Sequence, residues 1–386
     1  MRFAGWGRCV PSRIVTNRDL IRFFQMNDGG RFEAKERPLS EEEALELTIG
    51  PEADALDNLI QKMTGIRQRH WCNENETAIT LGERAARNAL RVGRVRASKV
   101  GAVICASETN PVDLPCLASL IANRLGVKKA LCFDIRAACC GFLLSLQTAR
   151  ALLESYQYVL VIASEALSSH LDTTDTNTTM LFGDGAGALL ITRGSEVDDL
   201  FHAVGVSEPD KWDILRADAR AANSIIKMDG RRVVRTSLNG MREETLEAIK
   251  KARIRLRDID HFFFHQNNVR ITEDLMKSLD IPPHKVYTNI YNYGNTSAAS
   301  IPLALCEAME SGILRFGDTI AMAATGAGMT SVATVVRWLD GRPKPSRLRR
   351  NTLASLLRAR RKLASLTKKW QSIIRKEVTD IITSLS

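Results

Sequence analysis

Aromatic residues, paired cysteines and long apolar runs are scarce in this 386-residue sequence, and each shortage excludes something. Only 6% of the residues are aromatic, so the core must be mostly aliphatic. The eight cysteines form no CxxC pair, which excludes zinc ribbons and disulfide frameworks. The longest apolar run, Tyr158–Ala163, is too short to span a bilayer, and Met1–Trp6 contains no apolar stretch typical of a signal peptide. We expect a cytoplasmic protein with reduced thiols.

The net charge of +10 is concentrated in a C-terminal tail, residues 341–386. This tail has thirteen Lys and Arg against two acids, so it carries +11 and the first 340 residues about −1. Its apolar residues recur at three- and four-residue steps, which predicts a basic amphipathic helix or helix pair. We expect peripheral contact with an anionic membrane through Trp370, docking of an acidic carrier protein, or packing on the body or a second copy. No nucleic acid partner is expected, because little aromatic interleaving accompanies the charge.

Helix and strand patterns alternate along the chain from about Ala78, which predicts an α/β fold with parallel strands covered by helices. The predicted helices are 78–92, 116–125, 141–153, 238–252, 271–279 and 297–311. The predicted strands are 2–10, 100–107, 130–135, 158–163, 261–265 and 318–324, with a glycine turn into another strand at 180–191. Residues 28–43 are polar and predict a loop or short insertion. The second set of elements follows an order similar to the first, which hints at a duplicated fold.

Cys139 stands where the buried strand predicted at 130–135 gives way to the helix predicted at 141–153. The unpaired N–H groups and the positive dipole end of a helix start favour a thiolate over a thiol. Cys139 is therefore a candidate nucleophile, whereas its neighbour Cys140 is expected to pack in the core.

Three further segments carry polar groups at the ends of predicted strands or the starts of helices. His265 follows an apolar strand, Asn295 lies near a predicted helix start, and residues 326–328 form a glycine turn. Each has an ordinary structural explanation as a satisfied histidine, an N-cap or a tight loop. The Gly-Asp-Gly-Ala-Gly stretch at 183–187 lacks the Lys-Ser/Thr of a P-loop and runs into a strand, so nucleotide binding is not expected there.

Taken together, these segments resemble the active-site motifs of the β-ketoacyl-ACP synthase III family. The matching motifs are Ala-Ala-Cys-Cys-Gly-Phe around Cys139, His-Gln-Asn-Asn-Val-Arg-Ile from His265 and Tyr-Gly-Asn-Thr-Ser-Ala-Ala-Ser around Asn295. The resemblance covers about residues 1–340. It implies a thiolase fold of two similar α/β halves in five layers (αβαβα), normally as a homodimer. The halves would be 1–195, carrying the nucleophile, and 196–340, carrying the His and Asn, followed by the tail 341–386.

The family resemblance also implies the chemistry. Cys139 would take an acyl group from acyl-CoA or acyl-ACP, and a decarboxylative Claisen condensation with malonyl-ACP or malonyl-CoA would follow, in fatty-acid or specialised-metabolite synthesis. His265 and Asn295 would stabilise the enolate, and the backbone N–H groups of Cys139 and Ala327 would hold the tetrahedral oxyanion. Arg270 and Asn268 would contact the phosphopantetheine. The chemistry requires no metal and no tightly bound cofactor.

Two departures from the family pattern leave the substrate open. Leu59 and Met63 stand where the family usually carries the Trp and Arg that hold the coenzyme A adenine, so the donor is expected to be a carrier protein or to bind differently. Glu108 resembles the catalytic glutamate of hydroxymethylglutaryl-CoA synthases and is a candidate general base for non-decarboxylative condensation. It could equally be a loop carboxylate paired with a nearby Arg or Lys. Two alternatives stay open: an acyltransferase that passes the acyl group to a hydroxyl or amine, and a silent partner subunit.

Overall fold

The computed structural model describes residues 1–194, 200–217 and 225–342, all within one compact unit, Met1–Arg342. The predicted basic amphipathic tail lies outside the described residues from 343 onward, and so do the membrane, carrier and packing roles predicted for it. Among the described residues, no helix has the length and apolar character that crossing a membrane requires.

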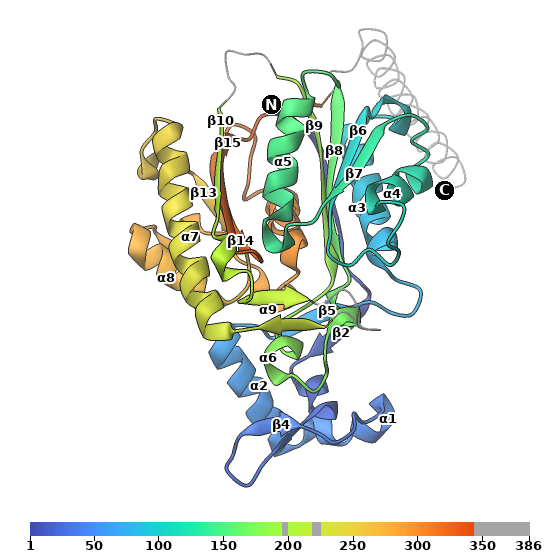
Figure 1. The fold of residues 1–386 in the computed structure, drawn as a ribbon, viewed down its shortest axis with the longest axis vertical. Helices are drawn as coiled ribbons and strands as arrows, with labels where there is room; N and C mark the ends of the chain where they lie inside the picture. Colours follow the sequence, from blue (N-terminus) through green and yellow to red (C-terminus); the bar gives the residue numbers. More distant parts are fainter. Residues whose placement is uncertain (195–199, 218–224, 343–386) are drawn as a thin grey trace, which may run out of the picture. The chain divides into compact units, whose positions relative to one another are not determined.

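Two mixed β-sheets form the centre of this unit (Figure 1). The first has the order β1 (Arg2–Cys9), β9 (Gly185–Thr192), β8 (Tyr158–Glu165), β6 (Ala102–Ala106) and β7 (Leu131–Ile135). The second has the order β10 (Phe201–Ser207), β15 (Thr330–Arg337), β14 (Thr319–Gly326) and β13 (His261–Phe264). The strands β6, β7 and β8 are mutually parallel, as are β13 and β14, whereas β1, β9, β10 and β15 run antiparallel to their neighbours. The alternation therefore predicted the parallel strands that form one side of each sheet, but not the antiparallel strands that form the other side.

Helices cover both faces of each sheet and give five layers (Figure 1). The outer helices on the first sheet are α3 (Ala78–Gly93) and α4 (Leu117–Leu125). The middle layer is α5 (Gly141–Leu152) and α10 (Ser300–Glu310), which contact both sheets, and the outer helices on the second sheet are α7 (Gly230–Lys251) and α8 (Val269–Leu279). The largest apolar cluster surrounds the middle layer and contains side chains from both sheets. This is the five-layer order that the family resemblance implies.

Smaller elements complete the described chain. They are the two-stranded antiparallel sheets β2 (Arg13–Thr16) with β5 (Gln68–Trp71), β3 (Phe24–Met26) with β4 (Phe32–Ala34) and β11 (Leu215–Ala217) with β12 (Ile226–Met228), and the helices α1 (Glu41–Ala44), α2 (Pro51–Thr64), α6 (Thr176–Thr179) and α9 (Ile290–Tyr293). The segment 28–43, predicted as a loop or short insertion, thus includes β4 and the start of α1. The domain boundary at residue 195 remains a prediction, although every strand of the first sheet precedes it and every strand of the second follows it.

Close backbone packing explains why the outer helix α3 is rich in alanine. A Cβ atom added at Gly5 of β1 would lie 2.0 Å from the carbonyl oxygen of Ala89 in α3, so only glycine permits this approach. The helix begins at a capping box in which the side chains and backbones of Thr77 and Thr80 bond reciprocally. Its buried face, which includes Leu81, Ala85 and Ala89, packs on the first sheet.

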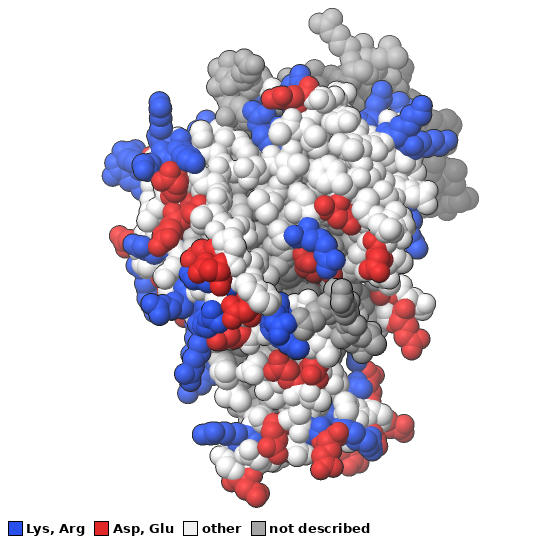
Figure 2. Space-filling view, in the orientation of Figure 1, with Lys and Arg blue, Asp and Glu red and all other residues white. Residues whose placement is uncertain are grey.

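Two predicted elements differ from the structure in ways that have a physical cause. The helix predicted at 238–252 begins at Gly230, because Asp229 caps it by accepting the Arg232 N–H and its first turns are polar and exposed. The strand predicted as buried at 130–135 is β7, whose residues are exposed or only partly buried because it lies at the edge of its sheet. On the face in Figure 2, acidic and basic side chains of the described residues are interspersed, in agreement with the small net charge outside the tail.

Candidate active site

Cys139 lies on a strained turn between β7 and α5. The turn is a short 3-10 helix, Ala138–Cys140, and Ala138 has a φ of 45° although it carries a side chain. Cys139 is 7% exposed. A Cβ atom at Gly326 would lie 2.8 Å from the Ala137 carbonyl oxygen and 3.0 Å from the Cys139 nitrogen, so the glycine turn after β14 closes directly against the nucleophile turn.

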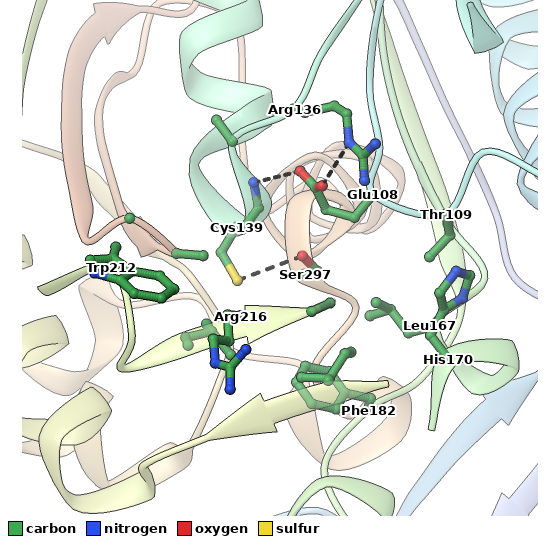
Figure 3. Close-up of a pocket in the computed structure, with 17 residues that line it drawn as sticks. Glu108, Thr109, Arg136, Cys139, Leu167, His170, Phe182, Trp212, Arg216 and Ser297 are labelled. Atoms are coloured by element: carbon green, nitrogen blue, oxygen red, sulfur yellow. Dashed lines mark hydrogen bonds and ion pairs between the residues drawn. The ribbon is translucent and has the colours of Figure 1, made fainter. Parts of the chain in front are cut away.

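The Cys139 thiol is protonated in the free site, contrary to the thiolate expected from its position at a helix start. Burial raises the pKa of this thiol to about 12, although a contact with Ser297 opposes the shift. The Sγ atom lies 3.6 Å from Ser297 Oγ (Figure 3). The helix-start effect is therefore outweighed by the removal of water, and the proton has to leave as the sulfur attacks.

His265 directly follows the last residue of β13, and Ser300 fixes the orientation of its imidazole ring. The backbone N–H of His265 donates to the Ala323 carbonyl oxygen at 2.8 Å, and ring Nδ1 lies 2.7 Å from Ser300 Oγ. Burial lowers the pKa of His265 to about 3, so the imidazole is neutral at physiological pH. Ser300 Oγ also accepts the Gln266 N–H at 3.5 Å, which leaves its hydroxyl proton to donate to Nδ1. In that tautomer Nε2 carries the ring proton and is a hydrogen-bond donor.

Asn295 is held by its backbone and by one side of its amide. Its backbone N–H donates to the Leu181 carbonyl at 2.8 Å, and its Oδ1 accepts the Ser297 N–H at 2.8 Å. This bond fixes the amide orientation and directs the Nδ2 donor elsewhere. Asn295 is 5% exposed and lines the same cavity as Cys139 and His265.

Two cavities meet at the nucleophile, and both are lined by Cys139, Phe182 and Leu215. The first, called the His265 cavity, has a volume of about 640 Å³. Its other lining residues include Met63, His265, Asn268, Arg270, Asn295 and Met329. The second, called the Glu108 cavity, has a volume of about 380 Å³. Its other lining residues include Glu108, Arg136, Leu167, Trp212 and Ser297, which Figure 3 labels, and Ala327.

The predicted phosphopantetheine residues lie on the lining of the His265 cavity, where α8 meets the end of α2. Asn268 caps α8 by accepting the Arg270 N–H at 2.9 Å, and its Nδ2 donates to the Met63 carbonyl oxygen. Arg270 donates to the Lys62 carbonyl oxygen at 2.7 Å. Leu59 and Met63 are each 39% exposed on α2, so this end of the helix presents apolar side chains.

Glu108 lies on the Glu108 cavity and is bonded to the nucleophile turn. Its Oε1 accepts the Ala138 N–H at 2.8 Å and its Oε2 accepts Arg136 Nε at 3.1 Å (Figure 3). The predicted pairing of the Glu108 carboxylate with a nearby Arg is therefore confirmed. The bond to the backbone of Ala138 was not predicted.

Behind Glu108 lies Glu165, a fully buried carboxyl at the end of β8. Its Oε2 accepts the Thr109 hydroxyl at 2.9 Å and the Glu108 N–H at 3.1 Å. Burial, and to a smaller extent the neighbouring Glu108 carboxylate, raise the pKa of Glu165 to about 8. Glu165 is therefore protonated at neutral pH.

The raised pKa predicts that the stability contributed by Glu165 falls with rising pH. Between about pH 4.5, the ordinary value, and about pH 8 the folded state holds a proton that the unfolded state has lost. The free energy of unfolding then falls by at most about 1.4 kcal/mol per pH unit from this group. Glu165→Gln does not titrate, so its melting temperature should rise relative to the parent chain from pH 5 to pH 8. Thermal unfolding of both chains across this range checks the prediction, and a constant difference would contradict it.

The sequence predicted Cys139, His265 and Asn295, which line one cavity, but it did not predict the residues that orient them. Ser297, Ser300 and Glu165 received no role, although both serines belong to the motif around Asn295. Periodic spacing of hydroxyls at a helix start could have indicated them, but N-capping explains the same pattern. Within the described ranges, no group of three or more His, Cys, Asp or Glu side chains could hold a metal ion.

Two family models, curated relatives and solved structures are similar to this chain. The family model described as 3-oxoacyl-[acyl-carrier-protein (ACP)] synthase III matches residues 133–208, and the model of its C-terminal part matches residues 249–338. The β-ketoacyl-[acyl-carrier-protein] synthase III of Aquifex aeolicus is 37% identical over 74% of this chain and 92% of its own length. That of Roseiflexus is 32% identical over 86% of this chain and 97% of its own. The crystal structure of the Aquifex aeolicus 3-oxoacyl-[acyl-carrier-protein] synthase III superposes with a TM-score of 0.76 at 33% identity, covering 87% of this chain and 99% of that one.

Proposed function

The chain belongs to the 3-oxoacyl-[acyl-carrier-protein] synthase III family of thiolase-fold acyltransferases, and we propose that it loads an acyl group on Cys139 and condenses it decarboxylatively with a malonyl thioester. The substrates are an acyl-CoA or acyl-ACP and malonyl-ACP or malonyl-CoA, in fatty-acid synthesis. The observation that carries the proposal is the single cavity lined by Cys139, His265 and Asn295.

In the first half-reaction, Cys139 Sγ attacks the thioester carbonyl carbon. A C–S bond to Cys139 forms, the C–S bond to the carrier breaks, and the proton that Cys139 loses is taken up by the departing carrier thiolate. The backbone N–H groups of Cys139 and Ala327 hold the oxyanion, which develops where the nucleophile turn meets the Gly326 turn. The product is another thioester of similar energy, so the acyl group stays transferable.

In the second half-reaction, the malonyl C–C bond breaks, CO2 leaves, and the electron pair remains as a thioester enolate. His265 and Asn295 are the donors available to its oxygen, because Ser300 fills Nδ1 of the ring and Ser297 fills Oδ1 of the amide. The enolate carbon attacks the acyl carbonyl carbon, the bond to Cys139 Sγ breaks, and the Cys139 thiolate that leaves takes up a proton from solvent. Arg270 and Asn268 contact the phosphopantetheine arm that delivers the donor.

The experiment is incubation of the purified chain with acyl-CoA and acyl-ACP panels of increasing chain length, followed by intact-mass measurement and then by a malonyl thioester. We expect an adduct on Cys139, followed by CO2 release and a β-ketoacyl product. We propose that the acyl tail lies in the Glu108 cavity, which Cys139 also lines, so the longest acyl group loaded reports the capacity of that cavity. The absence of an adduct with every donor would contradict the proposal. An adduct without CO2 release would indicate transfer to a hydroxyl or amine instead.

We also propose a homodimer in the cytoplasm. All eight cysteines are free, as in a reducing compartment. In the described part of the chain β7 pairs only with β6, and its free edge presents backbone N–H and C=O groups beside Leu131, which is 43% exposed. A second β7 paired along this edge would continue the sheet.

The proposed edge pairing predicts that Leu131→Lys shifts the chain from dimer toward monomer, because a charged side chain on an edge strand opposes pairing. Sedimentation velocity of the full chain measures the effect. Ile313→Lys is the matched control, since Ile313 is 46% exposed in the turn after α10. A monomeric parent chain, or equal dissociation of the two variants, would argue against the β7 interface.

A further inference from the structure

We propose that Glu108 is a positioning residue: its carboxylate holds the strained turn before Cys139 and so directs the Cys139 N–H toward the oxyanion. The inference rests on the proposed acyl transfer to Cys139. It gives Glu108 a task in acyl loading, before any second substrate arrives. A general base would instead act only on the second substrate.

The contacts of Glu108 connect the end of one sheet to the nucleophile turn. Its backbone N–H donates to Glu165 Oε2 at 3.1 Å, and its side-chain Oε1 accepts the Ala138 N–H at 2.8 Å. Glu165 is fully buried at the end of β8, so the link begins at a rigid point of the core. Arg136 completes the arrangement by donating to Oε2 from a side chain that is 72% exposed (Figure 3).

The turn needs such an anchor because its backbone is unfavourable. Ala138 has a φ of 45°, a value that residues with a Cβ atom rarely adopt. The bond from Ala138 N–H to Glu108 fixes the peptide on one side of that φ angle, and the Cys139 N–H belongs to the peptide on the other side. The carbonyl of that first peptide, from Ala137, also accepts the Cys140 N–H at 3.1 Å, so anchoring this peptide restrains the Cys139 N–H that lies between the two bonds. A relaxed Ala138 would rotate the oxyanion donor away from the carbonyl under attack.

The location of Glu108 does not favour a role as base. Both of its carboxylate oxygens already accept hydrogen bonds. Glu108 lines the cavity that it shares with Cys139, whereas the enolate donors His265 and Asn295 line the other one. The carbanion would therefore form in the His265 cavity, which Glu108 does not line.

Three substitutions separate hydrogen-bond reach from charge. In Glu108→Gln, the amide oxygen still accepts the Ala138 N–H, and the exposed Arg136 turns from the amide NH2 into solvent. Glu108→Asp keeps the charge but is one methylene too short to reach, and Glu108→Ala removes the acceptor. We expect Asp and Ala to slow single-turnover loading of Cys139 about 10- to 100-fold without changing the concentration of acyl donor at half-maximal rate. Gln should restore most of the rate.

A second measurement isolates the His265 cavity. CO2 release from a malonyl thioester by unloaded enzyme depends on His265 and Asn295, so it should be the same in all three Glu108 variants. Thermal melting identifies the variants that fold. If Glu108→Ala does not fold, the comparison of Glu108→Gln with Glu108→Asp still tests whether Glu108 acts by positioning the turn.

Two results would overturn the inference while leaving the proposed function intact. One is normal loading by the Asp and Ala variants. The other is that Glu108→Asp catalyses condensation and Glu108→Gln does not, although both variants load Cys139. Only a carboxylate can accept a proton, so this result would identify Glu108 as a general base. A parent chain that takes no acyl group from any donor would instead overturn the proposed function, and this inference with it.

Discussion

Cys139→Ala is expected to abolish acyl loading, with condensation reduced by at least about 10⁴-fold, the scale on which loss of a nucleophile acts. The adjacent Cys140 cannot replace it, because its Sγ lies in the core, 2.8 Å from the Thr330 carbonyl oxygen and 3.5 Å from that of Ala324. Because the variant keeps His265 and Asn295, it should still release CO2 from a malonyl thioester and return the acetyl thioester. Intact mass with an acyl donor, and CO2 release without one, are the two measurements.

The matched control is Cys140→Ala, which removes a buried sulfur one residue away and leaves the nucleophile in place. It should lose stability rather than loading. A persistent adduct on the Cys139→Ala chain, or one that moves to Cys140, would show that the nucleophile has been assigned to the wrong residue. Loss of both loading and CO2 release in Cys139→Ala would indicate damage to the whole site instead of removal of one group.

Asn295→Asp is expected to lower CO2 release from the malonyl thioester by about 10²- to 10³-fold, as for removal of one oxyanion donor. The aspartate still accepts the Ser297 N–H that Asn295 Oδ1 accepts at 2.8 Å, but it has no Nδ2 donor and places negative charge beside the enolate. Acyl loading on Cys139 should be retained, because it uses backbone donors. His265→Ala should lower CO2 release to a similar extent, since the neutral ring supplies the second donor.

The matched control for this pair is Ser300→Ala. It removes the partner of His265 Nδ1 at 2.7 Å but keeps the imidazole, so its loss of CO2 release should be smaller than that of His265→Ala. Isotope-labelled malonyl donor makes the release directly countable. Unchanged release in Asn295→Asp would remove Asn295 from the enolate site, and an equal loss of loading in the same variant would assign it to the first half-reaction.

The sequence predicted the parts of the site that depend on chain order. Cys139, His265 and Asn295 follow or precede strands and helices whose periodicity is strong, so the topology brings them together. The orienting contacts could not be predicted in this way: His265 meets Ser300 from 35 positions away, and Glu108 meets Ala138 from 30. These pairs depend on where loops lie after the sheets have packed, and loop residues show no periodic sequence pattern from which their positions could be predicted.

Two kinds of expectation were wrong for reasons of burial. The thiolate at Cys139 was expected from its place at a helix start, but desolvation determines its pKa once the second sheet covers it. The strand β7 was expected to be buried because its residues are apolar, but an edge strand and a central strand can have the same composition. Both errors have the same cause, because a local sequence pattern does not show which other segments of the chain will pack against it.

The meeting of two cavities at Cys139 has a consequence for the order of events. They share Cys139, Phe182 and Leu215, yet the proposed carrier contacts belong to the His265 cavity alone. In the proposed reaction, an acyl tail bound in the Glu108 cavity would leave the His265 cavity free, so the two carriers would enter by the same route in turn and the first would depart before the second arrives. Substitutions that enlarge the Glu108 cavity would then lengthen the product without changing which carrier delivers the substrate.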